Sequence, residues 1–386
     1  MRAQGRFRTR AAGILGLLLV VFLSTSLAED EPIDWELARE LRQKEMRGET
    51  LTEEEKAYLE RAKSERQKRT NSNEPSGPRE TTGLVPLTEL GEGLYKEHTG
   101  GLYGGELNVP PEAHALAAET QTALIQPLDA NGVPSETGTI VLISLGMSNT
   151  TQEFSTFKKL ADADPNKSPR VMLVDCAQGG QAAREWAIAP EEPTEDNARS
   201  PWVVMDQRLE KAGVTALQVQ VVWLKQAQKV PGGLGAFPAH AESLRDDVAV
   251  ILRRLKARFP NLSVAYLSSR IYAGYATTAL NPEPYAYESA FSVRWLIEAQ
   301  VAGDPELNYD PLKGEVKAPL LLWGPYLWAD GITPRLSDGL VWMREDLAND
   351  GTHPSISGRD KVARMLLEFF KTDTNAKRWF LREDTE

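Results

Sequence analysis

The segment from Asp350 to Pro354 carries the residue types of a proton-transfer pair. Asp350 and His353 lie three residues apart in a glycine-containing turn, just before a helical pattern. At this spacing the carboxylate can hold the imidazole Nδ1, which leaves Nε2 free to take a proton from a serine hydroxyl. A lone histidine is more often structural than catalytic. An Asp-x-x-His-Pro turn at the start of a helix in an α/β chain, however, much less often has a purely structural role. The segment therefore predicts a general base oriented by a carboxylate.

A serine that such a base could activate follows an apolar run. Ser148 comes directly after Ile143-Ser-Leu-Gly-Met, so we expect it on a sharp turn between a strand and a helix. There its hydroxyl would be exposed, and its backbone N–H would lie at a helix N-terminus, where it can stabilise an oxyanion. The alternative is that Ser148 only caps the following helix.

A glycine pair follows the second apolar run. Without a Cβ, Gly179 and Gly180 let the backbone approach a ligand closely, although a tight turn without a ligand would explain them equally well. The sequence has no His-Glu-x-x-His, paired-cysteine or Asp-x-Asp-x-Asp pattern, and its Gly-rich residues 100–105 lack the Lys-Ser/Thr of a phosphate loop. We therefore expect no metal and no cofactor.

Short apolar runs alternate with longer amphipathic stretches from about residue 139 onward. This alternation predicts βαβ units, a mostly parallel sheet and a three-layer αβα sandwich. Reactive groups in such sheets lie at the carboxyl ends of strands. The expected strands are Thr139–Leu145, Val171–Val174, Ala216–Trp223, Ser263–Leu267 and Pro319–Trp323. The expected helices are Pro111–Leu124, Gln152–Ala163, Ala239–Phe259, Pro284–Val301 and Ser355–Lys371.

Together these segments resemble the conserved blocks of the SGNH (GDSL-type) hydrolase superfamily, in particular carbohydrate acetylesterases such as rhamnogalacturonan and sialic acid acetylesterases. The likeness covers roughly residues 138–372. Its first block matches Gly146-Met-Ser-Asn149, its second matches Ala177 to Arg184, and its last matches Asp350 to Pro354. The resemblance implies a flavodoxin-like sheet.

The resemblance also assigns roles within the site. It implies that Ser148, His353 and Asp350 are catalytic and that the backbone N–H groups of Ser148 and Gly180 are oxyanion donors. Residues beside the blocks could contact substrate by stacking on a sugar or binding a carboxylate, although ordinary packing explains the aromatic ones more often. These candidates are Asn149, Arg184, Trp186, Arg270, Tyr326 and Trp328.

Two positions depart from the family pattern. Met147 replaces the usual Asp or Gln of the first block. The family's third block supplies an Asn side chain to the oxyanion hole, whereas this chain has Lys225 and Gln226 after the corresponding strand. Either side chain could donate the hydrogen bond instead, and losing one oxyanion donor typically costs about 100- to 1,000-fold in rate.

The resemblance thus implies a serine esterase that hydrolyses an acyl ester, above all an O-acetyl ester of a carbohydrate, by a Ser-His-Asp mechanism. The missing Asn keeps open a second hypothesis. In that case the chain is a catalytically inactive SGNH-like module that binds glycan or associates with the cell envelope.

The N-terminal part differs from the rest of the chain in its composition and in the pattern of its apolar residues. In residues 1–28 four arginines precede an apolar run, and small residues follow this run up to Ala28. This pattern predicts a signal peptide cleaved near Ala28 and therefore a secreted or periplasmic protein. An uncleaved membrane anchor is the alternative. Residues 29–80 read as a charged helical hairpin and linker, with Thr52 and Glu55 as a capping box; the hairpin could contact the envelope or a protein partner. A Gly/Pro-rich extension (81–137) and the SGNH-like domain (138–386) follow.

Charge narrows the possible partners. The formal net charge is −11, and loss of the four leader arginines, with no acidic residue, makes it −15. Such a chain is not expected to bind nucleic acid, or a membrane once the leader is cleaved. Its one cysteine, Cys176, permits no intrachain disulfide, so the fold must rely on its core.

Overall fold

The computed structural model describes residues 50–71, 78–191 and 199–382, together with isolated positions between 33 and 44. The predicted signal peptide and part of the predicted linker lie outside the described residues. The chain divides into two compact units, and the boundary between them along the sequence falls between Arg69 and Thr70. Within the described ranges, no helix combines the length and apolar character needed to cross a membrane.

The N-terminal unit contains helix α2 (Glu53–Asn71). The predicted capping box is confirmed at its start: the Glu55 backbone N–H donates to Thr52 Oγ1 (3.2 Å), and the Thr52 backbone N–H donates to Glu55 Oε2 (2.9 Å). Two orphan helix donors are satisfied in this way. The apolar side chains of this unit form a small cluster, which contains Leu41, Leu51 and Leu59 with Tyr58 against them.

The second unit is built on a parallel sheet that has five strands among the described residues. They are β3 (Ile140–Gly146), β4 (Val171–Asp175), β5 (Val219–Lys225), β6 (Val264–Ser268) and β7 (Leu320–Trp323). The spatial order is β4-β3-β5-β6-β7. This is the flavodoxin-like order, in which ligands bind at the carboxyl edge where the strand order reverses. The predicted α/β class and parallel sheet are confirmed.

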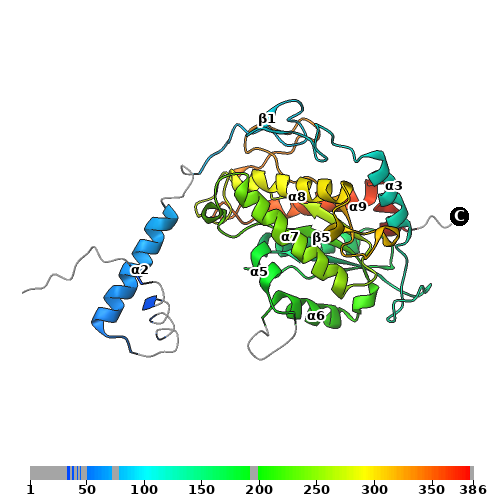
Figure 1. Cartoon of the computed structure of the whole chain (residues 1–386), viewed down its shortest axis with the longest axis horizontal. Helices are drawn as coiled ribbons and strands as arrows, with labels where there is room; N and C mark the ends of the chain where they lie inside the picture. Colours follow the sequence, from blue (N-terminus) through cyan, green and yellow to red (C-terminus); the bar gives the residue numbers. More distant parts are fainter. Residues whose placement is uncertain are drawn as a thin grey trace, which may run out of the picture. The chain divides into compact units, whose positions relative to one another are not determined.

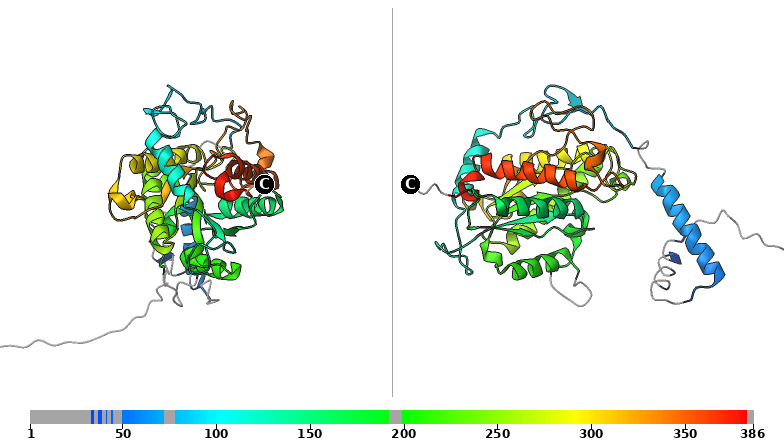
Figure 2. Two further views of the ribbon diagram at one scale, coloured as in Figure 1. Left: turned by 90° about the vertical axis from the view of Figure 1, so that its right-hand side faces the viewer. Right: turned by 180° about the vertical axis from the view of Figure 1, so that it is seen from behind.

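Helices cover both faces of this sheet. On one face α4 (Ser148–Ala163) packs against α9 (Ile356–Thr372), and on the other α7 (Ala239–Arg258) packs against α5 (Ala183–Ile188) and α8 (Tyr285–Val301), as Figures 1 and 2 show. The arrangement is the predicted three-layer sandwich. The unit also contains α3 (Glu112–Ala123), α6 (Pro201–Ala212), α10 (Lys377–Phe380) and a small antiparallel pair, β1 (Leu94–Tyr95) with β2 (His98–Thr99).

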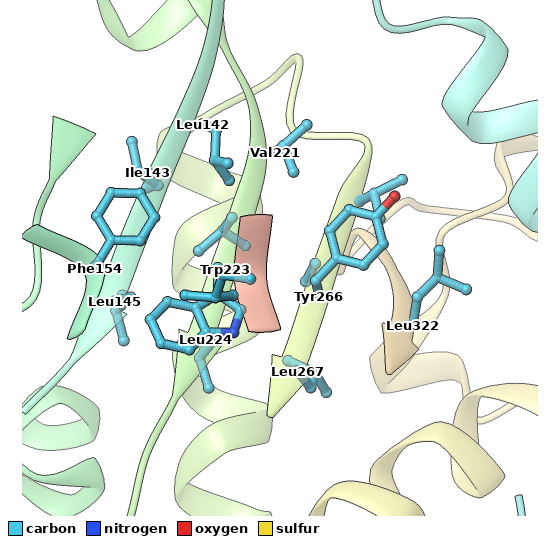
Figure 3. Packing of buried hydrophobic residues seen from close by; sticks show 14 of the residues in the cluster. Leu142, Ile143, Leu145, Phe154, Val221, Trp223, Leu224, Tyr266, Leu267 and Leu322 are labelled. Carbon is cyan, nitrogen blue, oxygen red and sulfur yellow. The ribbon is translucent and has the colours of Figure 1, made fainter. Parts of the chain in front are cut away.

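The strands are nearly continuous apolar runs because both faces of the sheet are covered. Every residue of β3, β5, β6 and β7 is buried. Figure 3 shows the resulting core around Leu142, Trp223 and Tyr266. Phe154 of α4 stacks on Trp223 of β5 with ring centroids 5.9 Å apart, and such contacts fix α4, and with it Ser148, above the end of β3.

The differences from the predicted elements are local. Residues 216–218 form a 3-10 turn before β5 rather than the start of the strand. Helix α4 begins at Ser148 instead of Gln152, because Ser, Asn and Thr suit the first turn of a helix although they are weak helix formers in its interior. Helices α5 and α6 and the β1–β2 pair were not predicted.

The extension before β3 packs on this unit through specific bonds. His114 of α3 is buried with Nε2 2.9 Å from the Leu321 carbonyl oxygen. The Leu87 backbone N–H donates to the Tyr326 hydroxyl (3.0 Å), and the Thr82 backbone N–H donates to Asp330 Oδ1 (3.0 Å).

Candidate active site

The structure brings Ser148, His353 and Asp350 together although 202 residues separate Ser148 from Asp350 in the chain. Ser148 Oγ lies 2.7 Å from His353 Nε2, and His353 Nδ1 lies 2.5 Å from Asp350 Oδ2. Both distances are hydrogen bonds, and they form the relay that lets an imidazole take a proton from a serine hydroxyl.

The turn around Gly351 fixes the carboxylate against the ring. Asp350 Oδ1 accepts hydrogen bonds from the backbone N–H groups of Thr352 (3.1 Å) and His353 (3.0 Å). Gly351 has φ +64, and a Cβ there would lie 1.8 Å from the Tyr275 carbonyl oxygen. Only glycine allows both this backbone conformation and this close approach.

These bonds also set the charge of Asp350. Burial alone would raise the pKa of its carboxyl, but hydrogen bonds from the His353 ring and from the His353 and Thr352 backbone outweigh burial and lower that pKa. Asp350 is therefore ionised at neutral pH. An ionised carboxylate orients the imidazole and stabilises the imidazolium that proton transfer creates.

Two side chains that were predicted to bind substrate form hydrogen bonds that brace this geometry. The buried Asn149 amide donates to the Thr352 carbonyl oxygen (2.9 Å), which ties the start of α4 to the histidine turn. Trp186 is fully buried, and its Nε1–H donates to the Gly146 carbonyl oxygen (3.2 Å), just before Ser148. Both residues act on the position of Ser148 and His353.

The predicted oxyanion amides border the same cavity. A Cβ placed on Gly179 would lie 3.8 Å from the Ser148 Cβ, so the two loops are in contact. Gly180 has φ +78 and lines the cavity. Neither the Ser148 nor the Gly180 backbone N–H has a hydrogen-bond acceptor within the described residues. Two backbone donors are thus available beside the Ser148 hydroxyl.

The cavity at Ser148 is small and lined by loops at the carboxyl edge of the sheet. Its volume is about 260 Å³. The lining residues are Met147, Ser148, Asn149, Gly180, Ala182, Gln228, Lys229, Arg270, Leu280, Asn281, Thr352 and His353. A larger cavity of about 510 Å³ lies near the amino ends of the strands, beside Gln220 and Ser263, but its described lining contains no histidine. The chemistry therefore places the candidate site at the smaller cavity.

Lys225 and Gln226, the predicted substitutes for the missing Asn, do not line this cavity. Lys225 Nζ donates to Glu153 Oε1 (2.6 Å), and both side chains are fully buried. Burial lowers the pKa of the Lys225 ammonium, and Glu153 opposes the shift. Gln226 is also buried, and neither atom of its amide has a described hydrogen-bond partner.

The other candidates for substrate contact lie in three different places: on the surface, in the core and at the cavity. Arg184 is 64% exposed, pairs with Asp247 (3.2 Å), and does not line the cavity. Tyr326 and Trp328 are buried in the core, as expected if they serve packing. Arg270 lines the cavity.

Four cavity residues were missed by sequence reasoning: Gln228, Lys229, Leu280 and Asn281. Gln228 lies three residues beyond β5, at the edge where strand ends meet, so its position offered a weak signal. Leu280 and Asn281 lie in an irregular loop between β6 and α8, and no periodic pattern indicates where such a loop folds. No cluster of three or more potential metal-ligating side chains occurs in the part of the chain that the structure describes.

Comparisons with known proteins find only weak structural similarities. No family model matches the chain, and no curated protein matches it. Among solved structures, the chain is similar to a gut microbial diltiazem-metabolizing enzyme, at 13% identity over 60% of this chain and 46% of that one, with a TM-score of 0.29. It is also similar to an extracellular lipase from Streptomyces rimosus, at 11% identity over 60% of this chain and all of that one, with a TM-score of 0.30. Likenesses this weak say nothing about function, which must come from the site itself.

Proposed function

We propose that the protein is a serine esterase that hydrolyses a short acyl ester, in particular an O-acetyl group on a carbohydrate. The observation that carries this proposal is the continuous relay from Ser148 through His353 to Asp350, with distances of 2.7 and 2.5 Å. The unbonded amides of Ser148 and Gly180 beside the relay support it.

The reaction follows from this geometry. His353 Nε2 takes the Ser148 proton as Oγ attacks the ester carbonyl carbon, and the carbonyl oxygen becomes an oxyanion held by the two backbone N–H groups. Collapse expels the alcohol, which receives the proton from His353 and leaves an acyl ester on Ser148. Water, deprotonated by His353, then attacks the acyl carbon, and collapse of this second intermediate releases the carboxylic acid and restores the serine.

The size of the cavity supports a short acyl group. At about 260 Å³ it falls below the roughly 300–1,000 Å³ of sites that enclose drug-sized ligands. The sugar would therefore extend out of the cavity while the acyl group enters it. The choice of a carbohydrate alcohol rests on the resemblance to acetylesterases.

The proposal is tested with p-nitrophenyl acetate, a longer p-nitrophenyl decanoate, a panel of acetylated sugars and a fluorophosphonate probe. We expect the wild type to hydrolyse the acetyl esters, to prefer acetate over decanoate and to be labelled by the probe. Ser148→Ala and His353→Ala should each lose about three orders of magnitude or more in kcat/KM, and Ser148→Ala should lose all labelling. A folded wild type that neither turns over any ester nor takes up the probe contradicts the proposal.

A second function is favoured by one observation, that Lys225 and Gln226 do not line the cavity. If no side chain completes the oxyanion hole, the protein would be an inactive module that binds glycan or the cell envelope. Glycan binding that survives Ser148→Ala, in a wild type without turnover, would support this alternative.

The proposed compartment is outside the cytoplasm, after cleavage near Ala28. Sequencing the N-terminus of the protein recovered from its native cells tests this, and an intact residue 1 would contradict it.

A further inference from the structure

Arg270 is a buried cation without a bonding partner at the catalytic cavity. It lies two residues beyond β6, is 1% exposed and lines the cavity beside Ser148 and His353. Its Nε and Nη2 atoms are buried and have no hydrogen-bond partner, and it forms no ion pair with a described residue. Burying a charge without such bonds is costly, so arginines in protein interiors are normally paired.

One nitrogen of this guanidinium, Nη1, is not fully buried. Nη1 also lacks a described partner, but unlike Nε and Nη2 it is not sealed by surrounding atoms. Arg270 therefore reaches the cavity through Nη1. Sheet register places it correctly for this role, because Gly146 of β3 is aligned with Lys225 of β5, and Lys225 with Ser268 of β6. Ser148 and Arg270 each lie two residues beyond aligned positions.

The other side chains with N–H donors on the cavity are already bonded to protein. Asn149 donates to the Thr352 carbonyl oxygen (2.9 Å), Gln228 to Asp247 (2.7 Å), Lys229 to Glu185 (2.6 Å) and Asn281 to the Gln228 carbonyl oxygen (3.2 Å). Among the described lining residues, Arg270 is thus the side chain whose N–H groups are all uncommitted. It is the candidate for the donor that Lys225 and Gln226 do not supply.

The charges around Arg270 favour a transient anion over a permanent one. Arg270 and Lys225 face the carboxyl groups of Glu153, Glu283 and Asp350, and burial raises the pKa of Glu283 to about 7, so the site has no excess positive charge. Burial lowers the pKa of Arg270, and these three carboxyl groups oppose the shift. An oxyanion formed from a neutral ester appears together with the His353 imidazolium, and the net charge of the site does not change.

We propose that Arg270 is the third oxyanion donor of this site. Its Nη1–H binds the ester carbonyl oxygen as that oxygen becomes the oxyanion, beside the backbone N–H groups of Ser148 and Gly180. The bond from Ser148 Oγ to the carbonyl carbon forms, the carbonyl π electrons move to oxygen, and the serine proton goes to His353. Arg270 keeps its own protons throughout. This inference rests on the proposed esterase function and names a residue of the same site.

The test compares Arg270→Met and Arg270→Lys with the wild type on p-nitrophenyl acetate. An interaction made only in the transition state lowers kcat and leaves KM nearly unchanged. We expect Arg270→Met to lose about 100- to 1,000-fold in kcat and Arg270→Lys to recover part of that loss. Because the Arg270 guanidinium has no bonding partner in the protein, Met should not lower the Tm by more than about 3 °C.

Arg335 provides the matched control. It is also a buried arginine (5% exposed), but its guanidinium is bound to Asp338 and to the carbonyl oxygens of Tyr326 and Trp328. Arg335→Met should lower the Tm clearly and keep kcat within about threefold of the wild type at a temperature where it is folded. The two variants therefore separate loss of a buried arginine from loss of the proposed donor.

Each other outcome has a defined meaning. An active, Ser148-dependent wild type whose Arg270→Met variant keeps kcat within about threefold overturns this inference and leaves the esterase proposal standing. A KM increase confined to an ester that carries a carboxylate, with unchanged kcat, overturns it too, because Arg270 would then be an anion-binding residue. A wild type that is inert and unlabelled by fluorophosphonate overturns both proposals.

Discussion

The ion pair between Lys225 and Glu153 should be worth several kcal/mol when only one partner is removed. Both side chains are 0% exposed, and Lys225 Nζ lies 2.6 Å from Glu153 Oε1. Lys225→Met leaves the Glu153 carboxylate buried without its cation. Breaking a buried pair in this way typically costs about 3–5 kcal/mol, a large part of the roughly 5–15 kcal/mol that stabilises a folded domain.

The reason for this cost is desolvation rather than attraction, so the double variant should be milder. Glu153→Leu combined with Lys225→Met removes both charges of the pair and keeps the volume similar. Such replacements are often neutral or stabilising. We expect each single variant to lose about 3–5 kcal/mol in free energy of unfolding and the double variant to lose clearly less than either. Urea denaturation of the four proteins measures both quantities.

The same variants test whether Lys225 acts on the substrate. Lys225 does not line the cavity, so the folded double variant should keep kcat on p-nitrophenyl acetate within about tenfold of the wild type, allowing for a small shift of Ser148 on α4. A single variant that loses under about 1 kcal/mol would refute the buried pair. A well-folded double variant that loses about 100-fold or more in kcat would return the oxyanion role to Lys225.

Three further variants probe the geometry of the relay. Asn149→Ala removes the donor to the Thr352 carbonyl oxygen, so kcat should fall about 10- to 100-fold because the turn that carries His353 is misplaced. An unchanged kcat would show that this turn keeps its position without the Asn149 hydrogen bond. Hydrogen bonds lower the pKa of the Asp350 carboxyl in the folded protein below its ordinary value of 3.8. The ionised carboxylate therefore stabilises the fold at pH values well above 3.8, and this contribution is lost as the pH falls through the folded-state pKa. The Tm advantage of the wild type over Asp350→Asn should therefore shrink between pH 7 and pH 3, and an advantage that grows on acidification would reverse this sign. Gly180→Ala places a Cβ in open space but at φ +78, so urea denaturation should show a loss of about 1–2 kcal/mol from backbone strain alone; no loss would mean that the turn relaxes.

Much of the fold could be predicted because its signals are local and repeated. The strands are apolar runs buried on both faces, and the long helices have a clear apolar stripe, so five strands and five helices were placed within a few residues of their observed bounds. Helix α5 escaped prediction because six residues are too few to show a helical period. The start of α4 was placed late because Ser148 to Thr151 are weak helix formers.

The relay of Ser148, His353 and Asp350 was also predictable, for a different reason. Asp350 and His353 are joined by one short turn, so their spacing alone brings the carboxylate to the ring. Ser148 and Gly180 follow strands, and parallel strands end at the same edge of the sheet. Geometry that the chain enforces over a few residues, or that a whole sheet enforces, can be read without a structure.

Side-chain direction at the strand ends could not be predicted. Successive residues of a strand point to opposite faces, so Lys225 and Gln226 could not both serve one site, and the sequence does not say which face is catalytic. Glu153 decided the matter for Lys225: it lies on α4, which covers that face, and binds the ammonium. Arg270 was predicted only as a candidate for binding a carboxylate, because its lack of a partner depends on where every neighbouring donor is bonded.

That uncommitted state is the most informative feature of the site. Buried polar groups in folded proteins are almost always hydrogen-bonded, because leaving one unpaired typically costs about 1–3 kcal/mol and more for a charged group. Here the Arg270 guanidinium is buried without a described hydrogen-bond partner, and it borders the same cavity of about 260 Å³ as Ser148 and Gly180, whose backbone N–H groups have no described acceptor. Donors left unpaired around a single point, next to a serine already bonded to its base, are what an oxygen that becomes negatively charged during a reaction requires.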